Sequence, residues 1–266
     1  MDKIIIEPIT SMKNAFSVAG QNVVITGGNR GLGRGIAQAF AECGANVAIL
    51  CRNEASGNEA AEQLRLLGSR AIAVKCDVGD FDSVLRAKEV VASEFDHIDT
   101  LVNNAGIDGK HGVFDDARLE EFKRVMNVNL DGVAAMIQVF GQWMMDEGRG
   151  GEIINISSIG GQAIGDPRAH PMPSYNASKA ALDHLTRHLA IVMGDYGIRV
   201  NSIAPGPTHS DLDAGLPPSI TEFIDVTMPM HRFGEPLEIG ALAVFLASPA
   251  AAQITGVVAN HDGGTM

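Results

Sequence analysis

The chain has 266 residues, of which 45% are hydrophobic but only 5% aromatic, so its core is mainly aliphatic and large enough for one α/β domain. Its formal net charge of −12 argues against nucleic acid or an anionic membrane as a partner. Cys43, Cys51 and Cys76 lack metal-ligand spacing, which favours a reduced, cytoplasmic setting without a bound metal.

Residues 1–15 are expected to form an amino-terminal extension, because the apolar run Ile4–Ile6 is too short for a signal peptide or a membrane span. Beyond it, short apolar runs alternate with amphipathic stretches. The expected strands are Asn22–Ile25, Val47–Leu50, Ala71–Lys75, Thr100–Val102, Glu152–Ser157, Arg199–Ile203 and Gly256–Asn260, and the expected helices are Gly31–Glu42, Glu54–Leu67, Phe81–Phe95, Leu119–Met145 and one that carries Tyr175. This alternation predicts one doubly wound α/β domain over residues 16–266, with a parallel sheet that helices cover on both faces.

A glycine-rich turn, Thr26–Gly33, follows the first strand and opens a helix. Glycines there permit a tight turn and let the backbone approach a pyrophosphate, whose charge is favoured at a helix N-terminus. An ordinary βα turn is the alternative, but the strand–turn–helix context favours a bound dinucleotide. The candidate cofactor contacts in this turn are Gly27, Asn29, Arg30, Gly31, Leu32 and Gly33.

The second strand is followed by Cys51 and Arg52. An acidic residue about 20 positions beyond the turn commonly accepts a hydrogen bond from the adenosine ribose. Cys51 offers no carboxylate to repel a phosphate, and the guanidinium of Arg52, or of Arg30, can pair with a ribose 2′-phosphate. NADP(H) is therefore favoured over NAD(H), unless both arginines are solvated surface charges.

The ends of the third and fourth strands supply further candidates. Asp77, with Val78 beside it, is placed to accept a hydrogen bond from an adenine amino group. The alternative role for Asp77 is a helix N-cap, for which Asp80 is equally suited. After the fourth strand, small residues let a ribose lie against the backbone, and the candidates are Asn104, Ala105 and Gly106.

The long helix Leu119–Met145 carries Asn129, a polar side chain that needs a partner if it is buried. It is either a functional group or a satisfied core amide. Val128, beside it, is a further candidate contact to the cofactor. The fifth strand ends in Ser157 and Ser158, and one of these hydroxyls is expected at the reacting centre.

Tyr175 and Lys179 lie one helical turn apart, so their side chains share a face. A fixed ammonium is expected to lower the pKa of a nearby phenol from its usual value of about 10. The tyrosine could then act as a general acid or base near neutral pH. The spacing alone is a weak signal, but here it follows a glycine turn, an Asn-Asn-Ala-Gly run and a strand that ends in serines.

Two long irregular segments, over residues 159–173 and 205–236, follow strands at the edge where open α/β sheets bind ligands. Loops of that length in a compact domain are usually functional. Pro205, Gly206 and Thr208 begin the second loop and are further candidate contacts.

Together and in this order, these motifs resemble the classical short-chain dehydrogenase/reductase family, over about Phe16–Gly264. The resemblance implies a Rossmann-type fold and hydride transfer with a nicotinamide cofactor. It implies that Tyr175 exchanges a proton with the substrate oxygen, while Lys179 holds the nicotinamide ribose. It further implies that Asn129 holds a water connecting the lysine to solvent and that Thr208 binds the carboxamide. It also implies a mobile lid over the substrate within residues 207–235. The implied catalytic set is Asn129, Ser158, Tyr175 and Lys179, with Ser157 as a structural neighbour.

Seventeen positions separate Ser158 from Tyr175, more than in most relatives. The excess falls within Gly160–Pro173 and includes His170–Pro173, which resembles the loop of sugar-ketone and polyol reductases. The expected function is therefore an NADP(H)-dependent oxidoreductase that interconverts a secondary alcohol and a ketone, most of all a polyol or sugar ketone. Hydroxysteroids and 3-oxoacyl thioesters are competing substrates.

Other functions have less support. A non-catalytic dinucleotide-sensing protein does not need the catalytic set, and a sugar-nucleotide epimerase needs a carboxyl-terminal domain for which the chain has no room. His184 and His188 share helical spacing, but Leu185 replaces the glutamate of the zinc-protease motif, and Gly-x-Ser-x-Gly is absent. Asp211 and Asp213 are expected to be solvated loop carboxylates. Relatives usually form tetramers, and small residues Ala177, Ala180 and Ala181 permit close packing in a tetramer or dimer.

Overall fold

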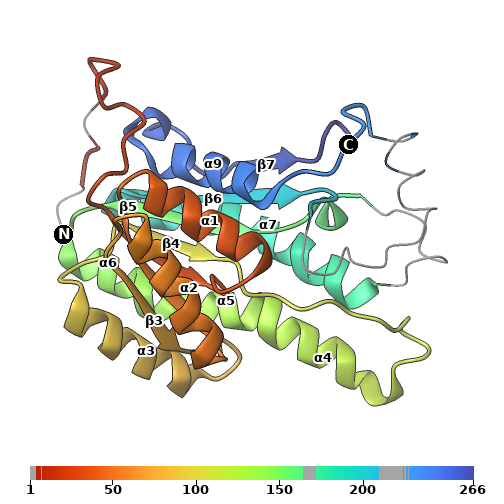
Figure 1. The fold of residues 1–266 in the computed structure, drawn as a ribbon. Helices are drawn as coiled ribbons and strands as arrows, with labels where there is room; N and C mark the ends of the chain where they lie inside the picture. Colours follow the sequence, from red (N-terminus) through yellow and green to blue (C-terminus); the bar gives the residue numbers. More distant parts are fainter. Residues whose placement is uncertain (1–3, 7, 164–171, 210–223, 225, 227) are drawn as a thin grey trace.

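The computed structural model describes residues 4–6, 8–163, 172–209, 224, 226 and 228–266 (Figure 1). In this part of the chain, seven parallel strands form one sheet in the order β3-β2-β1-β4-β5-β6-β7. The strands are β1 (Asn22–Thr26), β2 (Asn46–Cys51), β3 (Ala71–Lys75), β4 (Thr100–Asn103), β5 (Gly151–Ile156), β6 (Ile198–Pro205) and β7 (Val258–His261). The main helices are α1 (Gly31–Glu42), α2 (Glu54–Leu66), α3 (Phe81–Glu94), α4 (Glu120–Met126), α5 (Gly132–Met136), α6 (Gln142–Glu147), α7 (Pro173–Met193) and α9 (Pro236–Ala247). The predicted parallel, doubly wound sheet is confirmed.

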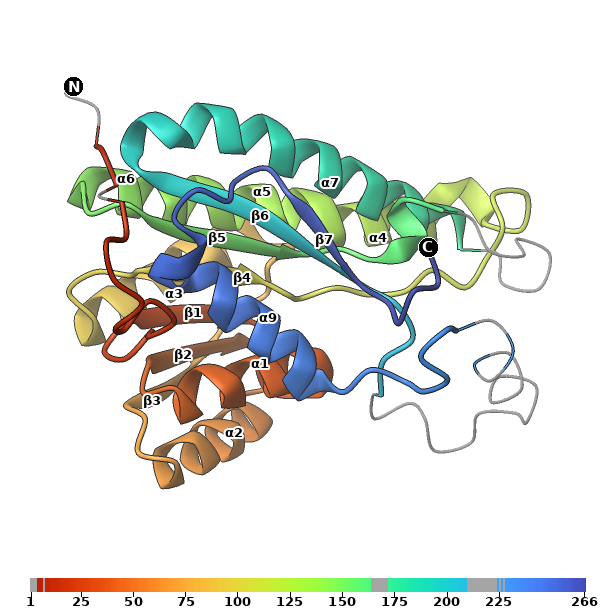
Figure 2. The same ribbon diagram turned by 90° about the horizontal axis from the view of Figure 1, so that it is seen from above.

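Helices cover both faces of the sheet, because successive side chains of a strand point to opposite sides. Val23 and Ile25 of β1 pack with α1, α2 and α9. Val24, between them, packs with α3, α5, α6 and α7. Figure 2 shows these two helical layers on either side of the strands. Within the described residues, no helix is both long and apolar enough to span a membrane.

The helix expected over Leu119–Met145 is one helical run from Glu120 to Glu147, interrupted by two π-helical segments, Asn127–Asp131 and Ile137–Gly141. Each π segment adds a residue to a turn and so changes which side chains face the sheet. The run ends at Gly148, whose φ of 64° suits a glycine cap. Asn129 lies in the first π segment and is fully buried.

Helix α9 is absent from the sequence expectations, and it packs against α1 beside the glycine turn. Gly35 of α1 lies against Pro236, and Gly240 of α9 lies against Ala39. A side chain at either glycine would overlap its neighbour, so the small residues let the two helices touch. A capping box between Glu235 and Glu238 fixes where α9 begins.

A buried ion pair joins β5 and β6 near the amino ends of the strands. Arg199 Nη1 lies 2.7 Å from Glu152 Oε2, and Arg199 also donates to Leu246 O and Ile254 O. Asn201 donates to the other carboxylate oxygen of Glu152 over 3.0 Å. Burial raises the pKa of Glu152 well above its ordinary value, while the charge of Arg199 opposes that rise.

Replacing Arg199 with Met is expected to lower the free energy of unfolding by about 3–5 kcal/mol, because it leaves the Glu152 carboxylate buried without its cation. Arg70→Met is the matched control, since Arg70 pairs with Glu94 at 3.1 Å on the exposed surface and its loss should cost at most about 1 kcal/mol. Urea unfolding of both variants measures the difference. Equal losses in the two variants would show that the buried pair adds nothing.

Candidate active site

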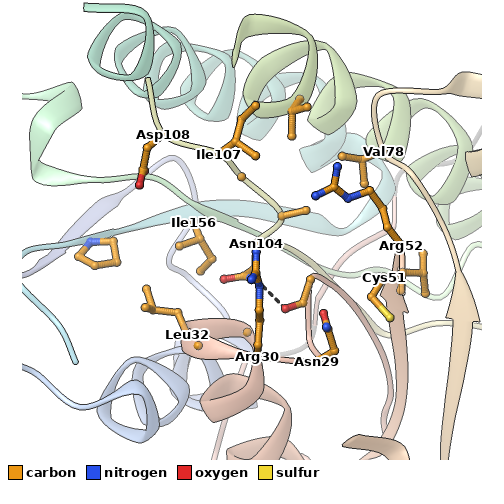
Figure 3. A pocket seen from close by; sticks show the side chains of 18 of the residues that line it. Asn29, Arg30, Leu32, Cys51, Arg52, Val78, Asn104, Ile107, Asp108 and Ile156 are labelled. Atoms are coloured by element: carbon orange, nitrogen blue, oxygen red, sulfur yellow. Dashed lines mark hydrogen bonds between the residues drawn. The ribbon is translucent and has the colours of Figure 1, made fainter. Parts of the chain in front are cut away.

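A cleft of about 730 Å³ opens at the carboxyl ends of the strands. Every residue expected to contact the cofactor lines it, from the glycine turn to Thr208. Ser158, Tyr175 and Lys179 line the same cleft, whereas Asn129 lies behind its wall. Sequence reasoning missed some lining residues, namely Leu50, Asn53, Ser56, Cys76, Ile107, Asp108 and Ile156. Figure 3 shows the cleft with Arg52 and Cys51 on one side and Asp108 on the other.

The glycine turn is tied to β4 by Asn104. The Asn104 amide donates to Thr26 O over 2.9 Å and to Gly27 O over 3.3 Å. Gly27 and Gly31 have backbone φ values of 67° and 52°, which residues other than glycine seldom adopt. The position of a Cβ on Gly33 would overlap Gly27 O and the Asn104 amide, so this glycine is needed for packing.

Gly33→Ala is expected to destabilise the protein by about 3 kcal/mol or more, because the added methyl group meets backbone that cannot move without breaking the turn. Gly31→Ala is the comparison, because a Cβ on Gly31 has no neighbour within 4 Å. Gly31→Ala should lower the free energy of unfolding by only about 1–2 kcal/mol, through backbone strain. It should nevertheless weaken dinucleotide binding. Thermal unfolding and NADPH titration separate the two effects. Equal stability of the two variants would contradict this assignment.

The start of α1 is suited to an anion. Arg30, the residue before the helix, makes no side-chain cap, so the first N–H groups of α1 are open to the cleft. With the empty space in front of Gly31, this arrangement fits the pyrophosphate of an extended dinucleotide.

The end of β2 presents positive charge. Arg52 and Arg30 are both exposed and line the cleft. Neither guanidinium has an ion-pair partner within the described residues. Cys51 is buried, and its Sγ lies 3.2 Å from Asn53 O. These features leave two cations in the cleft lining and no carboxylate at the position of Cys51.

Asp77 and Asp80 have separate places. Asp80 caps α3, and its side chain accepts a hydrogen bond from Asp82 N. Asp77 lines the cleft, and its Oδ1 accepts from Gly79 N over 3.1 Å. The capping alternative therefore belongs to Asp80, and Asp77 is open to the cleft.

Ser158, Tyr175 and Lys179 come together at the centre of the cleft. The Ser158 and Tyr175 hydroxyls are hydrogen-bonded. Lys179 Nζ donates to Ile156 O over 2.7 Å and lies 5.5 Å from the centre of the Tyr175 ring. Ser157 also lines the cleft, but its hydroxyl donates to Lys179 O and so ties β5 to α7.

The expected direction of the Tyr175 pKa is wrong for the protein alone. Burial raises the pKa of Tyr175 to about 12, the Ser158 hydrogen bond opposes the rise, and the charge of Asp108 adds to it. Burial likewise lowers the pKa of Lys179 to about 8, against the charges of Asp183 and Asp108. The ammonium is directed at Ile156 O over the ring face rather than at the phenol oxygen, so its charge does not offset desolvation.

Asn129 fixes the backbone beside the cleft. Its Oδ1 accepts from Ile107 N over 2.9 Å, and its Nδ2 donates to Ile107 O over 3.0 Å and to Ser178 Oγ over 3.1 Å. The amide is thus satisfied by protein groups. Its expected water relay to Lys179 stays a prediction.

The remaining candidates are Thr208, two histidines of α7 and residues of the two long loops. Thr208 lines the cleft, donates to Gly206 O over 3.0 Å and forms a bridge to Gly234. His184 and His188 are exposed on α7, and the described residues contain no metal-binding group of three or more His, Cys, Asp or Glu side chains. His170, Asp211, Asp213 and most of the expected lid lie outside the described residues.

Comparisons with known proteins agree with this geometry. A family model described as enoyl-(acyl carrier protein) reductase matches residues 27–266. An L-rhamnose 1-dehydrogenase (NAD(P)(+)) of Sphingomonas sp. (strain SKA58) is 35% identical over 92% of this chain and 96% of its own. A galactitol 2-dehydrogenase of Rhizobium johnstonii is 36% identical over 96% of this chain and 98% of its own.

Solved structures agree as well. A short-chain type dehydrogenase/reductase from Mycobacterium marinum is 33% identical, with a TM-score of 0.88 over 96% of this chain and 99% of its own. The fold, the cleft and these matches lead to one conclusion. The chain belongs to the classical short-chain dehydrogenase/reductase family of NAD(P)-dependent oxidoreductases, which interconvert alcohols and ketones.

Proposed function

We propose that the protein is an NADP(H)-dependent dehydrogenase/reductase that interconverts a secondary alcohol and a ketone in a polyol or sugar. The observation that carries the proposal is the cluster of Ser158, Tyr175 and Lys179 in a cleft that also contains the glycine turn. The two relatives described above act, by their names, on a sugar and on a polyol.

Different residues of the chain would bind different parts of the coenzyme. The turn at Gly31 and the N-terminus of α1 would hold the pyrophosphate. Arg52 and Arg30 would bind the 2′-phosphate of the adenosine ribose. Asp77 would bind the adenine, and Lys179 the nicotinamide ribose. The bound coenzyme supplies or accepts the hydride.

Tyr175 and Ser158 act on the substrate oxygen. Tyr175 would give its proton to the carbonyl oxygen during reduction and take it back during oxidation. Ser158 would hold that oxygen by a hydrogen bond and keep the Tyr175 hydroxyl oriented. Because burial keeps the pKa of Tyr175 at about 12 in the protein alone, its resting form is the proton donor.

A panel assay tests the substrate class. Purified protein is incubated with NADP(H) or NAD(H) and with polyols, sugar ketones, hydroxysteroids and 3-oxoacyl thioesters, and absorbance at the nicotinamide band is followed. Turnover of polyols with NADP(H) as the better coenzyme is expected. Turnover of steroids or thioesters alone would overturn the substrate assignment, and coenzyme binding without any turnover would favour a dinucleotide-sensing protein.

We further propose that α7 pairs with its copy in a dimer or tetramer. The outer face of α7 carries the small residues Ala177 and Ala180 and, near its end, Ile191, which is 81% exposed. An isoleucine so exposed, on a helix that also presents small residues, is suited to a contact between subunits. Light scattering after size exclusion gives the mass in solution, and a monomer of 28.0 kDa would contradict the proposal.

A further inference from the structure

Asp108 is a carboxylate at the substrate end of the cleft that the catalytic scheme does not use. It lines the cleft together with Ser158 and Tyr175. Figure 3 shows it across the cleft from Arg52 and Cys51, which lie at the coenzyme end. A substrate that reaches Tyr175 therefore passes close to this negative charge.

The backbone on both sides of Asp108 is held in place. Before it, both polar groups of the Ile107 backbone are bonded to the buried Asn129 amide. After it, Lys110 N and His111 N donate to Glu121 Oε1 over 2.7 Å and 2.8 Å. A carboxylate carried between two such anchors occupies a defined place, unlike an acid on a free loop.

The Asp108 carboxylate has no hydrogen-bond or ion-pair partner among the residues that the structure describes, and its side chain is exposed to the cleft. Its charge reaches the reacting groups, because it raises the pKa of both Tyr175 and Lys179. Asp108 thus makes Tyr175 a weaker acid, and no contact within the described residues offsets this effect. Hydrogen bonds from the hydroxyl groups of an incoming substrate would offset it.

We propose that Asp108 selects neutral, hydroxyl-rich substrates over anionic ones. An ionised carboxylate accepts several hydrogen bonds and donates none, so substrate hydroxyls are its natural partners. A carboxylate or phosphate on the substrate would instead meet a like charge in a partly desolvated cleft. The inference rests on the proposed function and adds to it which polar groups the substrate carries.

The test uses a matched pair of substrates, galactitol and galactonate, in which a carboxylate replaces one terminal hydroxymethyl group. Wild type should prefer galactitol. Asp108→Asn should shift the ratio of kcat/KM for the two compounds towards galactonate by about ten- to hundredfold, chiefly through KM, while Asp108→Glu should retain the wild-type preference. Asp115→Asn removes an exposed carboxylate from the same loop outside the cleft lining and should leave the ratio unchanged.

The outcomes separate the two proposals. An unchanged ratio in Asp108→Asn, or a wild-type preference for galactonate, overturns charge selection while polyol turnover stands. Turnover of neither compound by the wild type, with no turnover of any polyol or sugar ketone in the panel, overturns both. An equal shift in Asp115→Asn also overturns the inference, because the effect would then come from net charge and not from the place of Asp108.

Discussion

Replacing Tyr175 with Phe is expected to lower kcat about a thousandfold, while the affinity for NADPH changes by less than about threefold. The substitution removes one hydroxyl group and keeps the ring over which Lys179 lies. That hydroxyl is the proton donor hydrogen-bonded to Ser158. Stopped-flow or steady-state kinetics give kcat, and fluorescence titration gives the coenzyme affinity.

The chain offers a matched control, because its only other tyrosine is Tyr196. Tyr196 follows α7 in a short helical turn and does not line the cleft. Tyr196→Phe should therefore keep kcat near the wild-type value. More than a tenth of the wild-type activity in Tyr175→Phe would rule out Tyr175 as the main proton donor.

The pH dependence gives the same prediction a second readout. With a pKa raised to about 12, Tyr175 is protonated across the neutral range, so its proton should be available for ketone reduction throughout pH 6 to 9. A change in the rate of reduction near pH 8 should come from Lys179, whose pKa burial lowers to about 8. Alcohol oxidation needs the phenolate, whose fraction rises with pH below the pKa. Oxidation should therefore rise with pH in wild type, and this rise should disappear in Tyr175→Phe.

The sequence located the coenzyme end of the cleft because the candidates there follow strands. In a parallel sheet the carboxyl ends of the strands share one edge, so the glycine turn, Arg52, Asp77 and Asn104 had to lie near one another. The parallel pairing of β1 with β2 and β4, and of β2 with β3, confirms that shared edge. The edge can be predicted without knowing how the helices pack. Fold class and cleft lining were predictable for this reason.

Helix α9 was not predictable from hydrophobic periodicity. Apart from its first turn, its sequence, PLEIGALAVFLA, is apolar or small, so it has no polar face to mark a helical period. Its beginning is set by the capping box between Glu235 and Glu238, which is a readable signal that was missed. An all-apolar helix is recognisable only once a neighbour such as α1 is known to cover it.

The position of Asp108 depended on contacts that no local pattern reveals. It follows from Asn129, which reaches Ile107 from a π-helical segment, and from Glu121, which lies in α4 earlier in the same helical run. The error in the Tyr175 pKa has a similar origin. The helical spacing correctly placed Lys179 next to Tyr175. The burial of the Tyr175 hydroxyl and the direction of the Lys179 ammonium depend instead on how the cleft is packed.

Coenzyme preference is expected to reverse when Cys51→Asp is combined with Arg52→Ala. The loss of Arg52 removes charge-assisted hydrogen bonds to the 2′-phosphate, which are worth about 1.5–3 kcal/mol. The new carboxylate repels that phosphate and accepts a hydrogen bond from a free ribose 2′-hydroxyl. Together the changes should shift the ratio of kcat/KM for NADPH and NADH by about a thousandfold towards NADH.

One single variant and one control assign the effect. Arg52→Ala alone should lower kcat/KM for NADPH about ten- to hundredfold and leave that for NADH nearly unchanged. Arg86→Ala removes an exposed arginine that pairs with Asp80 and does not line the cleft, so it should not change either value. If wild type already prefers NADH, or if Arg52→Ala weakens both coenzymes equally, then Arg52 does not read the 2′-phosphate, because only a group that contacts the phosphate can discriminate between coenzymes that differ there alone.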